Sequence, residues 1–437
     1  MIALTRTLTD GLHDLGKIVL SMFERHNIHK TAAAIVVIIF AHNYRSSVVP
    51  VTDTLLNFEV FFYTYSGFFY YDELPFWSPY GMHGARWLLD LLNQVSPAQY
   101  VIGLAGKMMG ITDTLILYKT AVLFDILIFV GGMSSIAAYF LYNNLARLLL
   151  VLTATTFGMV WLSAPHFNGH IFYLMPWIIF YLLRYSITLE LFNLQIAILI
   201  FILNFIGNLT YYIPLQFATL TIFFCTIMYA RSGSLTWKKL GELFKYPYLY
   251  GSVLIAVAIS IVITAAFLVI GETTVITRPK LYNTLGEFLT YAKQPISETL
   301  AGFIKGLEFK NEGRNSYYIG LFPLFLIFRG AVVKLRTPIY LASTIVTVFL
   351  FGLSVGGVIA ASAYFFPGMF LYRHISLVFG LAGVFMAISA AVVLDHWIGA
   401  PSPIPVSPRC SLVYRRILKP FFILFIFDAA IIWLKEL

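Results

Sequence analysis

The chain has 437 residues, of which 59% are hydrophobic and only 11% are charged, and its mean hydropathy is +0.83. Soluble domains carry about 25% charged residues, so this composition excludes a soluble enzyme and predicts an all-α, polytopic integral membrane protein. Lys and Arg in loops beside the membrane explain the net charge of +9, because no basic motif with interleaved aromatics indicates nucleic acid as a partner.

The first 29 residues predict an amphipathic helix that lies on the cytoplasmic membrane surface. Apolar side chains recur at helical spacing from Leu8 to Phe23, and the opposite face carries charged residues such as Asp10 and Lys17. The charged face distinguishes this segment from a cleavable signal peptide.

About eleven apolar stretches are predicted to cross the bilayer, which takes roughly 17 to 25 residues each. They lie near 30–48, 114–141, 145–163, 168–186, 190–207, 211–230, 249–270, 316–330, 337–357, 373–396 and 417–435. We therefore expect a transmembrane domain over 30–397, a cytoplasmic linker rich in Pro and Arg over 398–416, and a last transmembrane helix over 417–437.

Basic residues cluster in alternate connections between these stretches, which places the N-terminus in the cytoplasm. The clusters include Arg25 and Lys30, then Arg147, Arg184, Arg231 and Arg329 in successive alternate connections. The other connections then face outward, and two of them, 49–113 and 271–315, are much longer than a connector requires. Loops of that length are usually functional.

The unusual polar residues gather on this outward side, where one extracytoplasmic cavity could contain most of them. They are Asp53, Glu59, Asp72, Glu73, His166, His170, Tyr211, Tyr212, Lys280, Tyr282, Arg373 and His374. The first outward loop is also rich in aromatic residues between Phe58 and Tyr80, more than a membrane-interface belt requires.

Several of these residues form an ordered set of motifs. Asp53 directly follows the first span and precedes the segment Leu74-Pro75-x-Trp77-x-Pro79-Tyr80. His166 and His170 before Pro176, the segment Tyr317–Leu324, and Phe366-Pro367 followed by Tyr372-Arg373 come later in the chain. In this order the motifs resemble bacterial multi-spanning glycosyltransferases of the GT-C type, in particular the YfhO-like branch.

The resemblance implies a GT-C-like fold with a large first extracytoplasmic loop, located in the inner (cytoplasmic) membrane of a bacterium. It also implies transfer of a sugar from a polyprenyl-phosphate donor to an acceptor on the outer face, with inversion at the anomeric carbon. Such a displacement needs a base and a cation for the departing phosphate. Asp53 is the expected catalytic base, and Arg373 suits the phosphate because guanidinium donates two parallel hydrogen bonds.

The other expected substrate-binding residues are Glu73, Trp77, Tyr80, His166, His170, Tyr211, Lys280, Tyr282 and His374. Loop aromatics are expected to stack on sugar rings or to cover the prenyl chain; they are Tyr63, Tyr65, Phe69, Tyr70, Tyr71, Phe76 and Trp77. The expected partners are the polyprenyl-phosphate sugar and membrane lipids, while partner proteins in a membrane complex stay open.

No metal site is predicted with certainty. His166 and His170 are one helical turn apart and could share a divalent metal, but no third ligand accompanies them. Asp53 also has no adjacent second acid, so no cofactor is expected and a divalent metal stays open.

Each assignment has a structural alternative. Asp53 could cap an interfacial helix over 54–65, and Arg373 could extend its charge to the outer membrane boundary. Asp125, within the second span, needs a partner such as Lys119 or another helix.

Two other functions also stay open: a non-catalytic GT-C-like subunit of a membrane complex, and a transporter of lipid-linked solutes. The transporter is less favoured because the predicted spans carry few polar residues at their centres and no internal repeat is visible.

Overall fold

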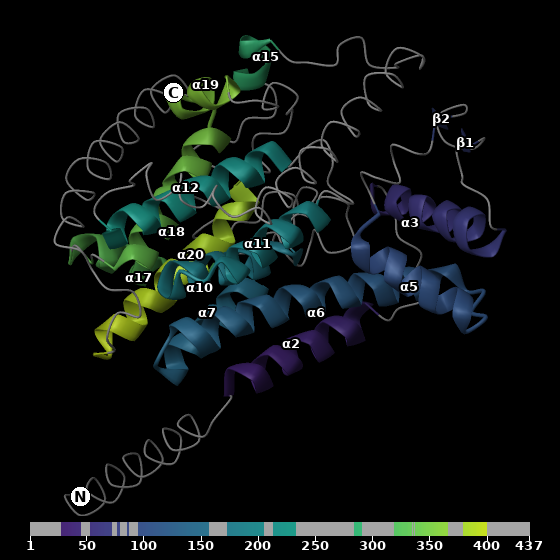
Figure 1. The fold of residues 1–437 in the computed structure, drawn as a ribbon, viewed down its shortest axis with the longest axis horizontal. Coiled ribbons are helices and arrows are strands. Elements are labelled where there is room, and N and C mark those ends of the chain that lie inside the picture. Colours follow the sequence, from purple (N-terminus) through teal and green to yellow (C-terminus); the bar gives the residue numbers. More distant parts are fainter. Residues whose placement is uncertain are drawn as a thin grey trace, which may run out of the picture.

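The computed structural model describes residues 28–44, 53–71, 77–78, 85–86, 95–156, 173–204, 213–232, 284–290, 319–333, 335, 337–365 and 379–399. Within these ranges the regular structure is helical except for β1 (Trp77–Ser78), which pairs antiparallel with β2 (Ala85–Arg86). The prediction of an all-α protein built from apolar helices is confirmed for this part of the chain (Figure 1).

Nine of the predicted spans coincide with helices in the described ranges. These helices are α2 (Ile28–Tyr44), α6 (Thr114–Phe140), α7 (Asn144–Thr156), α10 (Met175–Thr188), α11 (Leu191–Leu203), α12 (Ile213–Ser232), α17 (Leu321–Val332), α18 (Pro338–Ser354) and α20 (Phe379–Trp397). The predicted spans 249–270 and 417–435, the surface helix before residue 28 and the linker after residue 399 lie outside the described residues.

Two described helices, α6 and α20, are long and apolar enough to cross a membrane. A third span results if α18 and α19 (Val358–Tyr364) count as one, although their axes differ by 89° at the break between them. The other apolar helices are shorter. The total of eleven spans therefore stays a prediction.

Both long predicted loops contain helices. The range 49–113 holds α3 (Asp53–Thr64), the six-residue π-helix η1 (Tyr65–Tyr70) and α5 (Pro97–Met108), and the range 271–315 holds α15 (Leu285–Thr290). α3 and α5 pack against α6, and α15 packs against α19.

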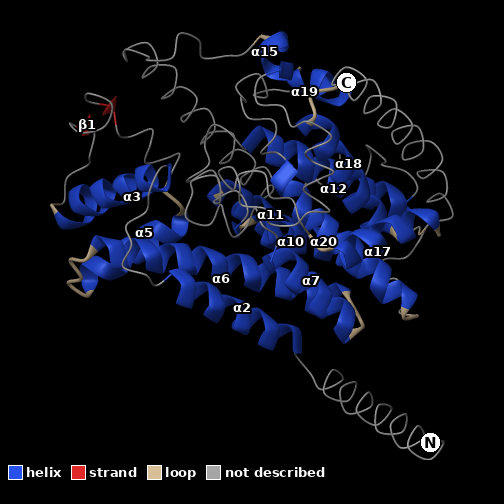
Figure 2. Cartoon of the chain, turned by 180° about the vertical axis from the view of Figure 1, so that it is seen from behind, coloured by secondary structure: helices blue, strands red, loops and turns tan. Residues whose placement is uncertain are grey.

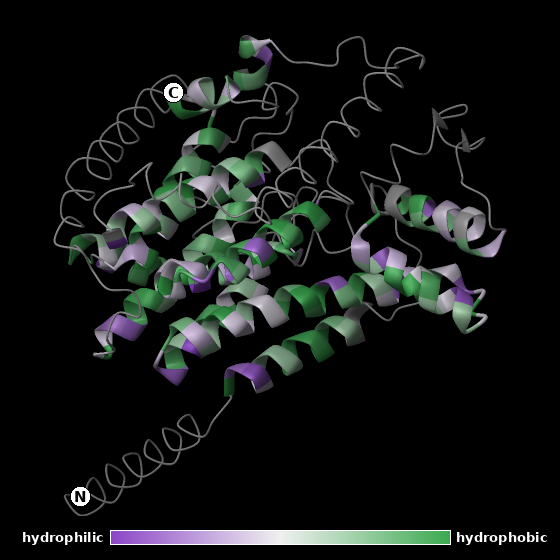
Figure 3. Cartoon of the chain, in the orientation of Figure 1, coloured by the Kyte–Doolittle hydropathy of each residue, from purple (hydrophilic) through white to green (hydrophobic). Residues whose placement is uncertain are grey.

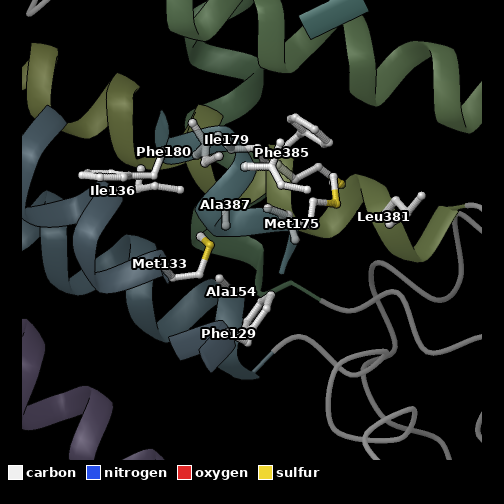
Figure 4. Close-up of a cluster of buried hydrophobic side chains, with 14 of the residues drawn as sticks. Phe129, Met133, Ile136, Ala154, Met175, Ile179, Phe180, Leu381, Phe385 and Ala387 are labelled. Atoms are coloured by element: carbon white, nitrogen blue, oxygen red, sulfur yellow. The ribbon is translucent and has the colours of Figure 1, made fainter. Parts of the chain in front are cut away.

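The core lies where α6, α7, α10 and α20 meet. Phe129, Met133 and Phe180 are buried there beside Phe385 of α20 (Figure 4). A Cβ atom on Gly132 would lie 2.7 Å from the Pro176 Cβ, so the absence of a side chain allows α6 and α10 to approach closely. Close approach at glycine is typical of helix contacts in membranes.

The outer surface of the helices is also apolar. Ile38 of α2, Phe192 of α11 and Phe328 of α17 are 65%, 67% and 60% exposed. The ribbons of these helices carry mostly the colour of hydrophobic residues (Figure 3). Water would oppose so much apolar surface, so the surface indicates a membrane-associated protein.

The predicted cytoplasmic cations lie together at one end of the described helices. Arg231 at the end of α12 donates to the carbonyl oxygens of Ser186 and Ile187 at the end of α10. The Arg184 guanidinium lies 5.7 Å from the Tyr139 ring centroid, and this contact joins the ends of α10 and α6.

The ends of α17 and α20 meet through Arg329, whose guanidinium lies 4.3 Å from the Trp397 ring centroid. Asp395 of α20 accepts hydrogen bonds from the backbone N–H groups of Tyr142 and Asn143, in the turn between α6 and α7. These contacts define the basic end, which carries Arg147, Arg184, Arg231 and Arg329.

The elements of the two predicted outward loops, α3, η1, α5 and α15, lie at the other end, together with α19. These elements and the adjoining first half of α6 are called the loop end. α5 packs beside the first half of α6, whereas the basic end adjoins the last residues of α6. α19 follows the end of α18 that is remote from Arg329. Figures 1 and 2 show this separation from opposite sides.

Candidate functional site

The predicted site falls mostly outside the described residues. α3 begins at Asp53, and Trp77 lies in β1 opposite Arg86, but the side chains of Asp53 and Trp77 are not described. Glu73, Tyr80, His166, His170, Tyr211, Lys280, Tyr282, Arg373 and His374 all lie outside the described ranges. That these residues form one site stays a prediction.

The start of α3 at Asp53 places this acid at a helix N-terminus. That position fits the alternative of a helix cap, and it also fits a base on a helix that packs against α6. Glu59, the other acid of α3, is exposed.

The aromatic residues of α3 and η1 divide into a buried and an exposed group. Phe61 stacks on Tyr65 with ring centroids 6.3 Å apart, and both lie in the core with Tyr118 of α6. The Tyr65 hydroxyl donates to the Ile111 carbonyl oxygen at 2.5 Å. A Cβ on Gly103 would lie 2.7 Å from the Phe69 ring, so α5 closes directly over this side chain.

Tyr65 and Phe69 are therefore core residues, and their expected role in stacking on a sugar or covering a prenyl chain is wrong. Tyr70 and Tyr71 differ, because they are 58% and 67% exposed. Their rings meet edge to face with centroids 5.1 Å apart and are open to a ligand. Tyr65 and Phe69 are four residues apart and are buried on one side of η1, whereas Tyr70 at its end and Tyr71 after it are exposed.

Among the described residues of the loop end, the most buried acidic group is Asp125, which is 3% exposed on α6. Its Oδ2 accepts a hydrogen bond of 2.8 Å from the Ser96 Oγ at the start of α5. A buried carboxyl group is costly without hydrogen-bond partners. The expectation that Asp125 is partnered through another helix is confirmed by this bond.

Ser96 also starts α5. Its Oγ accepts from the Gln99 N–H at 3.2 Å, and its own N–H donates to Gln99 Oε1 at 2.8 Å, which completes a capping box. The capping box of Ser96 and Gln99 was not predicted, although Ser96-Pro97-Ala98-Gln99 has the spacing of such a box with Pro at the first helical position.

Two further observations limit the chemistry of this region. Burial raises the pKa of the Tyr100 phenol in α5 to about 12, so this hydroxyl stays protonated near neutral pH and is not a base. Among the residues that the structure describes, no group of three His, Cys, Asp or Glu side chains is placed to hold a metal ion.

Comparison of the chain with protein-family models and with curated proteins found no match.

Proposed function

We propose that the protein is a membrane glycosyltransferase of a bacterial inner membrane, which moves a sugar from a polyprenyl-phosphate donor to an acceptor on the extracytoplasmic face. The position of α3 carries the proposal. α3 begins with Asp53, and Phe58 and Phe61 pack on Tyr118 with ring centroids 5.4 and 5.7 Å apart, at the loop end.

The sign of the charges supports the orientation. Cytoplasmic loops of membrane proteins are enriched in Lys and Arg, so the basic end belongs on the cytoplasmic side and α3 on the outer side. An acid beside the outer membrane surface is within reach of a lipid-linked sugar whose prenyl chain stays in the bilayer. Of the motifs that resemble GT-C-type glycosyltransferases, the segment Leu74-Pro75-x-Trp77-x-Pro79-Tyr80 follows α3 in the chain.

In the proposed reaction the acceptor hydroxyl oxygen attacks the anomeric carbon of the donor sugar. The bond from this carbon to the phosphate oxygen breaks, and Asp53 takes the hydroxyl proton. Polyprenyl phosphate leaves with the electron pair of the broken bond, and Arg373 stabilises its charge. The exposed rings of Tyr70 and Tyr71 provide a surface for the sugar.

The test uses the purified full chain in lipid nanodiscs with polyprenyl phosphates that carry radiolabelled glucose, galactose, mannose or arabinose. Release of polyprenyl phosphate is measured for the parent protein and for Asp53→Asn. General-base assistance contributes about 10²- to 10⁴-fold, so Asp53→Asn should lose that factor in kcat and retain donor binding. Glu59→Gln is the matched control, because it removes the same charge from an exposed position on the same helix.

Full turnover by Asp53→Asn would make Asp53 a helix cap and would refute the proposal for this residue. A parent protein that transfers none of these sugars, yet purifies in a stable complex with other membrane proteins, would favour the non-catalytic subunit.

A further inference from the structure

Several contacts join α3, η1 and α5 into one unit on α6, called here the α3–α5 layer. Gly103 of α5 contacts Phe69 of η1, and a Cβ on Gly106 would lie 2.7 Å from both Leu117 methyl carbons on α6. The Tyr65 hydroxyl binds the Ile111 carbonyl oxygen in the turn between α5 and α6. The layer thus has apolar contacts to α6 along its length and polar contacts at a few points.

A short path leads from Asp125 through this layer to the helix of Asp53. Asp125 accepts the hydrogen bond from Ser96, and the preceding residue, Val95, is 1% exposed. Val95 packs against Val60 of α3, which is 0% exposed, with Tyr63 and Tyr100 beside them. Val60 lies about two helical turns after Asp53 on the same helix.

The chemistry of this path explains why a carboxyl group occupies a buried position on an apolar helix. Packing between apolar side chains and glycines permits small sliding and rotation of one helix on another. A hydrogen bond between two buried side chains is directional, and it is retained in some proteins because it specifies one arrangement. Val95 directly precedes Ser96, so a hydrogen bond that fixes Ser96 also restrains the residue that packs against Val60 of α3.

We propose that Asp125 is a positioning residue, which through Ser96 and the contact of Val95 with Val60 sets the orientation of α3 and thereby the place of Asp53. The catalytic consequence rests on the proposed glycosyl transfer. The structural statement does not, because it concerns only the orientation of α3 relative to the rest of the helices.

The structural statement is tested with spin labels on the full chain, in a background without Cys225 and Cys410. The labels are placed at Glu59 of α3 and Phe192 of α11, which are both exposed, and the distance distribution is measured by pulsed electron resonance. Asp125→Leu should shift or broaden this distribution, because Ser96 loses its acceptor. Asp125→Asn should match the parent, since its amide oxygen can still accept from Ser96.

Asp395→Asn is the control for general destabilisation, because Asp395 is another buried carboxyl group but lies at the basic end. This variant should leave the label distribution unchanged. Ser96→Ala breaks the same hydrogen bond from the other side and should reproduce the effect of Asp125→Leu, so it decides the question if Asp125→Leu does not fold. A parent-like distribution in the variant that folds would overturn the inference.

The catalytic consequence is tested by combining variants. Small misplacement of a catalytic group costs up to about 100-fold in rate, so we expect Asp125→Leu to lower kcat between about tenfold and 100-fold with little change in the KM for the donor. In the Asp53→Asn background the same change should have no further effect, because Asp125 acts through Asp53. Independent, multiplying losses would show that Asp125 does not act through Asp53.

Failure of the inference and failure of the proposed function are distinguishable. If the parent transfers no sugar, the proposed function fails, and the label distances still decide whether Asp125 orients α3. If the parent is active and Asp125→Leu leaves both kcat and the label distances unchanged, only the inference fails.

Discussion

A comparison of Asp395, which is buried, with Asp113, which is exposed, tests how a buried carboxylate holds the helices together. Each accepts two backbone hydrogen bonds, but the geometry differs. At Asp395 each oxygen accepts one bond, Oδ1 from Asn143 N at 2.7 Å and Oδ2 from Tyr142 N at 3.1 Å. At Asp113, the N-cap of α6, Oδ1 alone accepts both bonds, from Leu115 N at 3.0 Å and Ile116 N at 3.1 Å.

Replacement by Asn should therefore have very different costs at the two positions. In Asp395→Asn the new side chain would keep one acceptor oxygen and turn its amide group toward a backbone N–H, in a site where Asp395 is only 4% exposed. A hydrogen bond to a charged group contributes about 1.5 to 3 kcal/mol, and a buried donor left without a partner costs about 1 to 3 kcal/mol. Because these terms overlap, we expect Asp395→Asn to lower the free energy of unfolding by about 2 to 4 kcal/mol.

Asp113→Asn should be nearly neutral. The amide oxygen of Asn can accept both bonds that Oδ1 accepts, Asn is as good an N-cap as Asp, and Asp113 is exposed. The lost charge at the helix N-terminus costs about 0.3 to 1 kcal/mol. Reversible unfolding in mixed detergent and SDS micelles, followed by tryptophan fluorescence, measures both variants. Equal losses at the two positions would refute this explanation.

The remaining predictions concern the donor site, the orientation and the bend after α18. Arg373→Lys should clearly weaken the affinity for a polyprenyl-phosphate sugar in detergent, because only Arg binds phosphate through two parallel bonds. Arg373→Gln should weaken this affinity further, and both variants should show little change in thermal stability. Equal donor affinity of Arg373→Lys and the parent protein would reject the phosphate role. Single cysteines are introduced in a cysteine-free background at Glu59 and Glu287 of the loop end, and at Thr31 and Glu190 of the basic end. An impermeant thiol reagent added outside should label the cysteines at the loop end and spare those at the basic end. The reverse result would invert the proposed topology. Gly352→Ala should lower the free energy of unfolding by about 1 to 3 kcal/mol, because its Cβ would overlap the Ile359 Cδ1, and the same change should cost less in an Ile359→Ala background if this contact is its cause.

Apolar length alone located the helices well where a long run has clear ends. α6 was expected over 114–141 and extends from Thr114 to Phe140, with Asp113 as its cap. The predicted span 337–357 ends at the break between α18 and α19, whereas the short helix α19 after the break was not predicted. Gly356, with φ of 80°, and Gly357 mark the position, since a left-handed backbone favours glycine.

Side-chain roles in the first loop were harder to predict, because they depend on register. Four aromatic residues lie in one short segment, yet Tyr65 and Phe69 are buried whereas Tyr70 and Tyr71 are exposed. Composition does not show which side of η1 faces α5. The partner of Asp125 depends on how α5 folds back along α6, which the sequence indicates only through the capping box at Ser96.

Only two acidic side chains are buried among the described residues, Asp125 and Asp395, and both belong to apolar helices. Each accepts hydrogen bonds from a separate part of the chain, one at the loop end and one at the basic end. In a bilayer the hydrophobic effect contributes little to the association of one helix with another, so close packing and directional hydrogen bonds specify the arrangement. Two buried carboxyl groups therefore connect separate segments at opposite ends of the described helices: Asp125 joins α6 to the start of α5, and Asp395 joins α20 to the turn between α6 and α7. The large apolar surface between them supplies packing but little direction.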